Sequence, residues 1–386
     1  MSPRTFDIAV IGAGIAGASV AAELARTHRV IVLERESIPG YHSTGRSAAL
    51  FSEIYGNAVV RALSRASRAF FYSPPDDFAQ SALVRPRGSL YVARGEQMRK
   101  LESFADNRDI ANSIRRIAPA EALRLCPILR PDYVNGAVLE PDAADVDVDA
   151  LHQGYLRRFR AAGGTLALNG DVQNLEYRDG RWHIGAGDET IVCSTVINAA
   201  GAWATAVAAS AGATPYKIQP CRRTAVLVEL PAGMSANDWP MVIDIEESFY
   251  LKPDAGLLLI SPADETPVTA CDVQPEEFDI AVAIDRIERA TTLKIARVRK
   301  RWAGLRSFAP DRSPIIGFDP ELPAFFWLAG QGGYGIQTAP AAARLAATLV
   351  RGEAIPPELA GVSVADLSPA RFGVRQSATR ALESER

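Results

Sequence analysis

The fold of this chain is decided by the stretch Ile8-Ala9-Val10-Ile11-Gly12-Ala13-Gly14-Ile15-Ala16-Gly17. A second apolar run, Val30-Ile31-Val32-Leu33, follows a segment of small residues and ends at Glu34. The order of strand, glycine turn, small-residue helix, strand and acid is that of a dinucleotide-binding βαβ unit. We therefore predict that residues 6–34 bind a nucleotide.

Each glycine of this turn has a physical task. Gly12 permits the tight turn, Gly14 lets backbone amides approach a pyrophosphate, and Gly17 lets the helix pack closely on the strand. The N-terminus of the helix adds unpaired amide groups and the positive end of its dipole. Glu34 is placed to accept hydrogen bonds from a ribose diol.

Composition limits what the chain can be. Its 386 residues suit two domains of common size. Hydrophobic residues make up 48% and charged residues 23%, as in soluble globular proteins. The net charge of −3 gives no electrostatic reason to expect nucleic acid or an anionic membrane surface as a partner.

Cysteine usage and hydropathy set the expected location. The four cysteines contain no CxxC pair, so we expect neither a metal site nor a disulfide framework, and we expect a reducing cytoplasm. The uncharged run at residues 8–22 carries the fingerprint glycines and is shorter than the roughly 20 residues that span a bilayer. We expect no targeting segment and no membrane span.

Two further glycine turns follow buried strands. Residues 191–198 are expected to form one strand that runs into Ala200-Gly201, and residues 324–329 another that precedes the glycine loop 330–335. Residues 216–300 alternate short strands with turns, which predicts an antiparallel sheet. Helical patterns occupy residues 58–72, 96–126, 149–162 and 339–351.

The predicted fold class is α/β, with a discontinuous Rossmann-like βαβ domain and a second domain that combines an antiparallel sheet with helices. Residues 1–85, 146–215 and 301–365 are assigned to the first domain. Residues 86–145 and 216–300 are assigned to the second. Residues 366–386 carry charge without an apolar period and are expected to be a mobile tail.

The chain resembles the class of FAD enzymes that contains glycine oxidase and D-amino-acid oxidase, and within it is most similar to D-arginine dehydrogenase. The resemblance is carried, in order along nearly the whole chain, by IGAGIAGAS (11–19), VLERE (32–36), PGYHSTGRSAA (39–49), DALHQGYLR (149–157), NAAGAW (198–203), ESFYLKPDAG (247–256), WAGLRSF (302–308) and QGGYGIQT (331–338).

This resemblance implies FAD, held without a covalent bond, rather than NAD. It assigns to the cofactor the residues Gly12, Gly14, Ile15, Ala16, Gly17, Glu34, Arg35, His42, Ser43, Thr44, Arg46, Ser47, Ala48, Val172, Ala200, Gly201, Trp203, Gly335, Ile336, Gln337 and Thr338. The last four would meet the flavin pyrimidine at a helix N-terminus, whose dipole stabilises the reduced flavin.

For the substrate, the resemblance implies that Arg223 and Arg306 clamp an α-carboxylate. Tyr55 and Tyr250 would add hydroxyl donors, and Gly333 would offer a carbonyl group to the amine. The planar guanidinium fork suits a carboxylate, and two of them fix Cα against the flavin. Arg222 alternates with Arg223 on a strand, so at most one of the pair is expected in the site.

The implied reaction is hydride transfer from Cα of a D-amino acid to flavin N5, after which the imino acid hydrolyses to a 2-oxo acid and ammonia. The electron acceptor, whether a quinone, a dye-like acceptor or oxygen, stays open. Two other functions also stay open: oxidation of N-methyl or cyclic secondary amino acids such as sarcosine or proline, and a flavin-bearing binding protein.

Two positions depart from the D-arginine enzyme. Ser89 stands where that enzyme carries the glutamate that receives the substrate guanidinium, and Leu50 stands where it carries a histidine. An unpaired buried cation costs several kcal/mol, so neutral or apolar D-amino acids are expected to be preferred over D-arginine. The alternative is that Glu53, in the loop that also contains Leu50, replaces the missing acid and preserves activity on D-arginine.

Overall fold

The fingerprint segment forms the first unit of a six-stranded sheet in the computed structural model, which describes residues 3–187, 189–213 and 216–373. Its central strands are mostly apolar and buried on both faces, as expected of a covered parallel sheet, and only the last strand runs antiparallel to its neighbour. In spatial order they are β10 (Thr165–Ala167), β3 (Val30–Leu33), β2 (Ile8–Ile11), β14 (Thr195–Asn198), β22 (Phe325–Ala329) and β21 (Ile315–Phe318).

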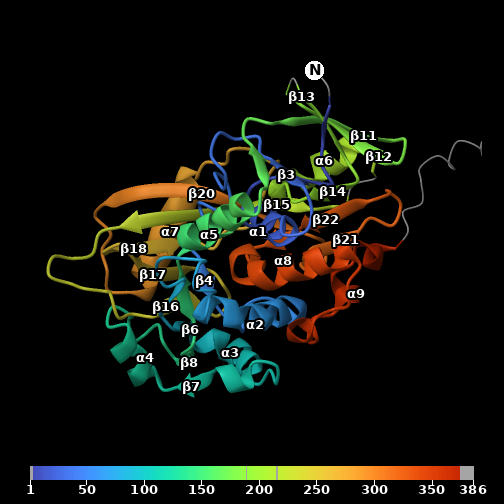
Figure 1. Ribbon diagram of the computed structural model, residues 1–386. Coiled ribbons are helices and arrows are strands. Elements are labelled where there is room, and N and C mark those ends of the chain that lie inside the picture. Colours follow the sequence, from blue (N-terminus) through green and yellow to red (C-terminus); the bar gives the residue numbers. More distant parts are fainter. Residues whose placement is uncertain (1–2, 188, 214–215, 374–386) are drawn as a thin grey trace, which may run out of the picture.

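Helices cover one face of this sheet (Figure 1). Helix α1 lies between α5 and α8, and α2 packs on α8. The opposite face is covered by a small four-stranded sheet and a short helix, whose core includes Trp182 and Trp327. The helices are α1 (Ile15–Leu24), α2 (Ala58–Tyr72), α5 (Val148–Ala161), α6 (Ala204–Ser210) and α8 (Gly335–Arg351), and the small sheet contains β1 (Arg4–Thr5), β13 (Glu189–Cys193), β12 (Arg181–Ala186) and β11 (Val172–Arg178).

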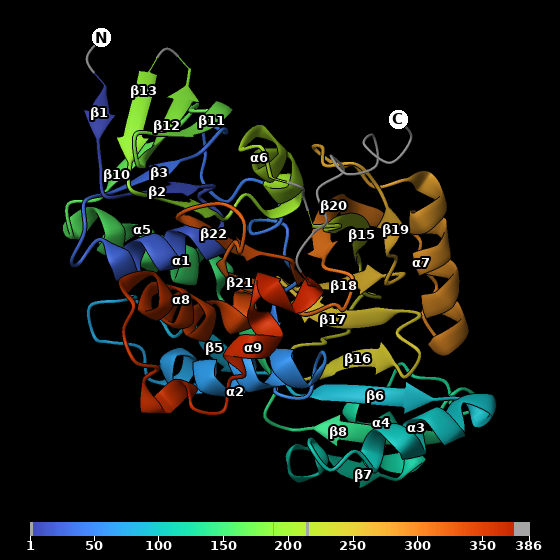
Figure 2. The same ribbon diagram turned by 90° about the vertical axis from the view of Figure 1, so that its right-hand side faces the viewer.

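A ten-stranded sheet lies beside the six-stranded one, with α7 (Glu277–Ala290) packed along it (Figure 2). Neighbouring strands are antiparallel except for one parallel pair, β16 with β6, which joins the two chain segments of the sheet. Its path is β23 (Gln331–Gly332), β20 (Val298–Phe308), β15 (Gln219–Val228), β18 (Leu257–Ser261), β17 (Tyr250–Asp254), β16 (Met241–Asp244), β6 (Ser89–Ala93), β8 (Gly136–Glu140) and β7 (Arg115–Ile117), and β19 (Thr266–Pro267) pairs with β15.

The remaining elements are short. A three-stranded sheet connects the loop before α2 to the strand that precedes α5. It contains β4 (Leu50–Phe51), β9 (Ala144–Val146) and β5 (Val84–Pro86), and the other helices are α3 (Met98–Ala105), α4 (Pro119–Leu125), α9 (Val364–Leu367) and the 3-10 turns η1 (Gly95–Gln97), η2 (Ala111–Ser113), η3 (Gly201–Trp203), η4 (Pro357–Leu359) and η5 (Pro369–Phe372). In the described part of the chain, no helix combines the length and apolarity needed to cross a bilayer.

The predicted α/β class is confirmed, but two predicted elements are wrong. Residues 96–126 are not continuously helical, because Arg115–Ile117 adds an edge strand beside β8 with only Ile117 buried. Residues 191–198 are not one strand. The amides of Ser194 and Thr195 both donate to the Asp7 carbonyl, at 3.0 and 3.1 Å, and the chain passes there from the small sheet to the six-stranded sheet.

The predicted domain boundary at residue 301 falls inside β20, and the division into domains stays a prediction. At the C-terminal end, a mobile tail was expected from residue 366, but residues 366–373 pack on the protein. Leu367 of α9 is fully buried, and Pro369 is buried as well. The rest of that predicted tail, residues 374–386, lies outside the described residues.

Candidate active site

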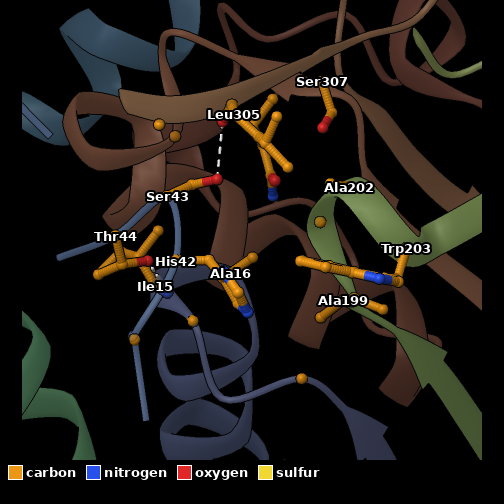
Figure 3. A pocket seen from close by; sticks show the side chains of 18 of the residues that line it. Ile15, Ala16, His42, Ser43, Thr44, Ala199, Ala202, Trp203, Leu305 and Ser307 are labelled. Carbon is orange, nitrogen blue, oxygen red and sulfur yellow. Dashed lines mark hydrogen bonds between the residues drawn. The ribbon is translucent and has the colours of Figure 1, made fainter. Parts of the chain in front are cut away.

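The three glycine-bearing turns surround one cavity of about 300 Å³ (Figure 3). It lies between the β2–α1 turn, the β14–η3 turn and the start of α8. Ligand sites of this kind form where neighbouring parallel strands end. The predicted cofactor residues that line it are Gly12, Gly14, Ile15, Ala16, Glu34, Arg35, His42, Ser43, Thr44, Arg46, Ser47, Ala48, Val172, Ala200, Gly201, Trp203, Gly335 and Ile336.

The β2–α1 turn is packed too closely for any residue but glycine at two positions. Gly12 has φ +101°, and a Cβ there would lie 2.6 Å from the Ala199 carbonyl oxygen. A Cβ on Gly17 would lie 1.8 Å from the Gly12 carbonyl oxygen. Because Gly12 lies so close to Ala199, the β2–α1 turn and the β14–η3 turn are in direct backbone contact. Gly17 lines no cavity and acts through this packing.

Side chains from elsewhere fix the same turn. Glu34 is buried, and its Oε2 accepts from the Ala13 amide at 2.7 Å while Oε1 accepts from Glu36 N at 3.0 Å. The Thr44 hydroxyl accepts from Ile15 N at 3.0 Å and so takes one amide of the first helical turn. The amides that follow at the start of α1 have no intrahelical partner, which leaves them available to an anion.

One end of the cavity is built from aromatic and polar side chains. The His42 ring lies 4.6 Å from that of Trp203, and the Arg35 guanidinium carbon lies 4.9 Å from the centre of the Trp203 ring. His42 Nε2 contacts Glu36 at 2.9 Å, whereas its Nδ1 is buried without a hydrogen-bond partner among the described residues. A cavity lined by glycine turns and a buried acid, with a polar atom that has no partner among the described residues, fits a dinucleotide.

The segment between β3 and β4 is fastened across the cavity to β20. Ser43 Oγ donates to the Leu305 carbonyl at 2.7 Å (Figure 3). Arg46 donates to the carbonyls of Val273 and Ala303, at 2.9 and 3.1 Å, and pairs with Asp272. Arg46 lines the cavity, but its charge is already compensated by the protein.

A second cavity of about 80 Å³ continues from the first. Its other walls are mostly apolar, and they include Leu50 and Met241. All five predicted substrate residues line it, and four of them also line the larger cavity. The residues common to both cavities are Ser47, Ala48, Arg223, Tyr250, Arg306, Gly333 and Ile336, and Tyr55 and Gln337 line the second alone.

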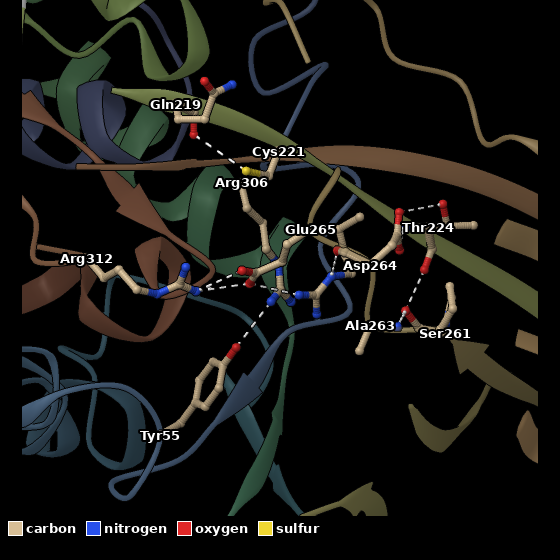
Figure 4. Close-up of polar contacts among 12 residues, drawn as sticks. Tyr55, Gln219, Cys221, Thr224, Ser261, Ala263, Asp264, Glu265, Arg306 and Arg312 are labelled. Atoms are coloured by element: carbon tan, nitrogen blue, oxygen red, sulfur yellow. Dashed lines mark hydrogen bonds and ion pairs between the residues drawn. The ribbon is translucent and has the colours of Figure 1, made fainter. Parts of the chain in front are cut away.

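Arg306 lies at this junction without an acidic partner. Its Nη1 donates to the Tyr55 hydroxyl at 3.1 Å (Figure 4), and Gly333 leaves room for the guanidinium, since a Cβ there would lie 2.8 Å from Nη1. Among the described residues, no carboxylate lies within ion-pair distance of it. Burial by itself would lower the pKa of Arg306. The nearby Tyr55 and Tyr250 outweigh this effect and raise the pKa above its ordinary value. Arg306 is thus a charged group that can accept an external anion.

Arg223 is more strongly held than Arg306. Its Nε donates to the Asp264 carbonyl at 2.7 Å, and its Nη2 pairs with Glu265 at 3.1 Å. Arg312 also pairs with both oxygens of Glu265, at 3.0 Å (Figure 4). Arg222 points to the opposite face, where it pairs with Glu276 and Asp279 beside α7. The expected alternation of the two neighbouring arginines is confirmed.

Several residues that the sequence analysis singled out make contacts within the protein or lie away from the cavities. Thr338 lines neither cavity, and its hydroxyl donates to the Tyr334 carbonyl at 2.8 Å. Gln337 donates to Ser64 at 2.7 Å from α8. Glu53 pairs with Arg68 at 3.0 Å and lines neither cavity, and Ser89 is fully buried and also lines neither.

Some lining residues were not predicted. The larger cavity also touches Gly170 and Asp171, which follow β10 at the carboxyl edge of the parallel sheet. That edge position was a usable signal, because ligands bind there in open α/β sheets. The second cavity adds Tyr91, from the middle of β6, and Glu247, from the turn between β16 and β17, which only the folded sheet brings together.

Comparison with known proteins agrees with this architecture. Glycine oxidase from Geobacillus kaustophilus is 24% identical over 360 residues, which cover 89% of this chain and 93% of that one. Human mitochondrial sarcosine dehydrogenase is 24% identical over 84% of this chain, which spans only 37% of that longer protein. The structure of L-proline dehydrogenase from P. horikoshii superposes with a TM-score of 0.82 at 25% identity, covering 96% of this chain and 98% of that one.

The family model for FAD dependent oxidoreductases (DAO) matches residues 7–349, from the start of β2 to the end of α8. This range contains both cavities and all the side chains that line them. The chain therefore belongs to the DAO family of FAD-dependent oxidoreductases.

Proposed function

We propose that this protein catalyses the FAD-dependent oxidative deamination of D-amino acids to 2-oxo acids and ammonia through an imino acid. The observation that carries the proposal is Arg306, a guanidinium at the junction of the two cavities with a hydroxyl partner and no carboxylate partner among the described residues. A half-buried cation without a counter-ion is costly, and the α-carboxylate of an amino acid would supply the missing charge.

The substrate would be held by groups on three strands and two loops. Arg306 on β20 and Arg223 on β15 would clamp the carboxylate, and Tyr55 and Tyr250 would add hydroxyl donors. The backbone carbonyl of Gly333 would accept from the amine. With the carboxylate and the amine both held, Cα has one orientation toward the larger cavity.

The cofactor residues named above would hold FAD along the 300 Å³ cavity, with Glu34 at the ribose and the start of α1 at the pyrophosphate. Bound FAD supplies a two-electron acceptor for the hydride on Cα. Ile336 lines both cavities and thus lies where cofactor and substrate meet. The imino acid would hydrolyse after release into water.

Neutral or apolar side chains are the proposed substrate class. Leu50, Met241 and Phe249 give the second cavity an apolar wall. Glu53, the candidate replacement for the acid absent at Ser89, is neutralised by Arg68. Among the described residues, Glu247 is the one acid that lines the second cavity, and it is exposed, where solvent screens its charge.

A second candidate is the oxidation of secondary amino acids, of the sarcosine or proline type. It is supported by the names of the relatives, which include sarcosine dehydrogenase, and of the L-proline dehydrogenase structure. The clamp of Arg306, Arg223 and the tyrosines would serve either substrate, because both carry an α-carboxylate. Retained D-arginine dehydrogenase activity through Glu53 is a third candidate, and the ion pair of Glu53 with Arg68 argues against it.

The test is an anaerobic spectral titration of the purified flavoprotein with D-leucine, D-arginine, D-proline, L-proline and sarcosine. Bleaching of the flavin by D-leucine at the lowest concentration is the expected result. Fastest bleaching by L-proline or sarcosine would favour the second candidate. No bleaching by any amino acid would support a flavin-bearing binding protein and would reject the proposal.

We also propose a cytoplasmic location, because the four cysteines are free in the structure, with three of them buried. The electron acceptor can be identified by reoxidising the bleached protein with air or with a soluble quinone. Rapid return of the yellow colour in air would identify an oxidase, and return only with the quinone would identify a dehydrogenase.

A further inference from the structure

A buried carboxylate lies behind the second cavity and belongs to none of the groups assigned above. Glu140 is the last residue of β8 and is 1% exposed. It lines neither cavity and, among the described residues, has no basic partner. A buried charge without an ion pair is costly unless hydrogen bonds satisfy it.

Three donors converge on this carboxylate. Its Oε2 accepts from the Ser52 hydroxyl and from the Ser89 hydroxyl, both at 2.8 Å. Its Oε1 accepts from the backbone amide of Glu53 at 2.9 Å. Two of the three contacts thus reach one short segment of the chain, outside the sheet that carries Glu140.

That segment, residues 52–57, joins β4 to α2 and carries Tyr55; we name it the Tyr55 loop. Glu140 holds its first two residues, and Asn57 closes its other end by capping α2, where its Oδ1 accepts from Val60 N at 3.0 Å. Between these two fixed ends, the Tyr55 hydroxyl reaches Arg306. The loop therefore has few ways to place Tyr55 once both ends are held.

We propose that Glu140 is a positioning residue, which holds the start of the Tyr55 loop so that the Tyr55 hydroxyl meets Arg306 and the substrate carboxylate. The part of this inference that concerns substrate rests on the proposed function. The part that concerns the loop does not depend on it.

The strand register explains why the acid is found here. Ser89 on β6 pairs directly with Glu140 on β8. Ser89 is the position where the resemblance to D-arginine dehydrogenase expects an acid. In this chain an acid stands one strand away, and its oxygens are taken by the Tyr55 loop and by Ser89 itself. Glu140 therefore serves the loop that binds the carboxylate and does not face the substrate side chain.

Four variants of the FAD-loaded protein separate this role from simple packing. Glu140→Ala removes the acceptor, and Ser52→Ala removes the side-chain donor on the loop. Glu140→Gln keeps an acceptor and the shape. Ser89→Ala is the matched control, because it removes a hydrogen bond of the same length to the same oxygen but none to the loop.

Two measurements apply to each variant: hydrogen exchange of the amides in residues 52–57, and the affinity for benzoate, a carboxylate that cannot be oxidised, read from the flavin spectrum. We expect Glu140→Ala and Ser52→Ala to speed loop exchange and to weaken benzoate binding, by about tenfold for Glu140→Ala. We expect Glu140→Gln to restore most of both, and Ser89→Ala to change either by less than about threefold.

Unchanged loop exchange in both Glu140→Ala and Ser52→Ala would overturn the proposal. So would equal effects of Ser52→Ala and Ser89→Ala, because these would indicate general loss of packing. If Glu140→Ala fails to fold, the results for Ser52→Ala and Glu140→Gln still decide whether Glu140 positions the loop. The two proposals can also fail separately. If the wild-type protein oxidises no amino acid but Glu140→Ala still speeds hydrogen exchange in the Tyr55 loop, the proposed function is rejected and the role of Glu140 in the loop is kept.

Discussion

The Tyr55 hydroxyl accepts a hydrogen bond from Arg306 Nη1 at 3.1 Å, although the two residues are 251 positions apart in the chain. Tyr55 comes from the loop before α2, and Arg306 comes from β20 of the ten-stranded sheet. The contact therefore joins two separately built parts of the protein at the junction of the two cavities. In the proposed function, the geometry of this contact determines how the substrate carboxylate is bound there.

Replacement of Arg306 by alanine should abolish this reception. Charge-assisted hydrogen bonds to a carboxylate contribute about 1.5–3 kcal/mol each, so kcat/KM should fall at least about 100-fold for every amino acid that the wild type oxidises. Steady-state kinetics would measure the fall. Arg301→Ala is the control, because Arg301 lies on the same strand but is exposed. Unchanged affinity in Arg306→Ala would show that the carboxylate is bound elsewhere.

The side-chain preference can be tested at Glu53. We expect a higher kcat/KM for D-leucine than for D-arginine, and we expect Glu53→Gln to leave this ratio within about threefold, because Arg68 already neutralises Glu53. Kinetics with the two substrates would measure the ratio. A preference for D-arginine that Glu53→Gln abolishes would instead assign the substrate cation to Glu53.

The close contact of the β2–α1 turn predicts a large effect of one methyl group. Gly17→Ala places a Cβ 1.8 Å from the Gly12 carbonyl oxygen, so α1 must move away from the turn. We expect a loss of about 3 kcal/mol or more in unfolding free energy and loss of the bound flavin. Thermal unfolding and the flavin absorbance of the purified protein would measure both. In Gly361→Ala, where no atom lies within 4 Å of the added Cβ, we expect neither loss.

Glu140 predicts a pH dependence of stability. Burial raises its pKa to about 7, from an ordinary value of 4.5, against the lowering effect of the hydrogen bonds from Ser52 and Ser89. The acidic groups that face it are Glu53, Tyr72 and Tyr91. The folded state therefore binds the proton of Glu140 more tightly than the unfolded state does. The resulting contribution to the free energy of unfolding is present in full below pH 4.5 and is lost as the pH rises through 7.

A shift of this size corresponds to at most about 3 kcal/mol of unfolding free energy. Glu140→Gln should therefore gain stability relative to the wild type between pH 5 and pH 8, measured by urea denaturation across roughly this range. Parallel pH profiles of the two proteins would contradict the prediction.

Local sequence signals were sufficient for the first βαβ unit and for α2. The spacing of Gly12, Gly14 and Gly17 was enough to predict the first turn, although the close contact of Gly12 with Ala199 appears only in the folded chain. Helix α2 was predicted with its correct bounds, Ala58 to Tyr72, because its apolar period is strong and Pro74 ends it.

Signals failed where distant contacts decide the structure. Helix α8 starts at Gly335, four residues before the prediction, although glycine and Pro340 disfavour helix. The Ser67 hydroxyl of α2 accepts a hydrogen bond from the Ala341 amide at 3.1 Å, and this contact with a neighbouring helix has no signal in the sequence of α8 itself. Likewise, the pairing of Ser89 with Glu140 depends on strand register, which no local pattern in either strand specifies.

The arrangement of the six-stranded sheet has a consequence for biosynthesis. Strand β14 is bonded to β2 on one side and to β22 on the other, and β22 spans Phe325–Ala329. Until that segment has left the ribosome, β14 has an open edge, and pairings between distant segments form late and slowly. We therefore expect the flavin to be captured only by a nearly finished chain, and nascent chains that stop before residue 325 to need protection from aggregation.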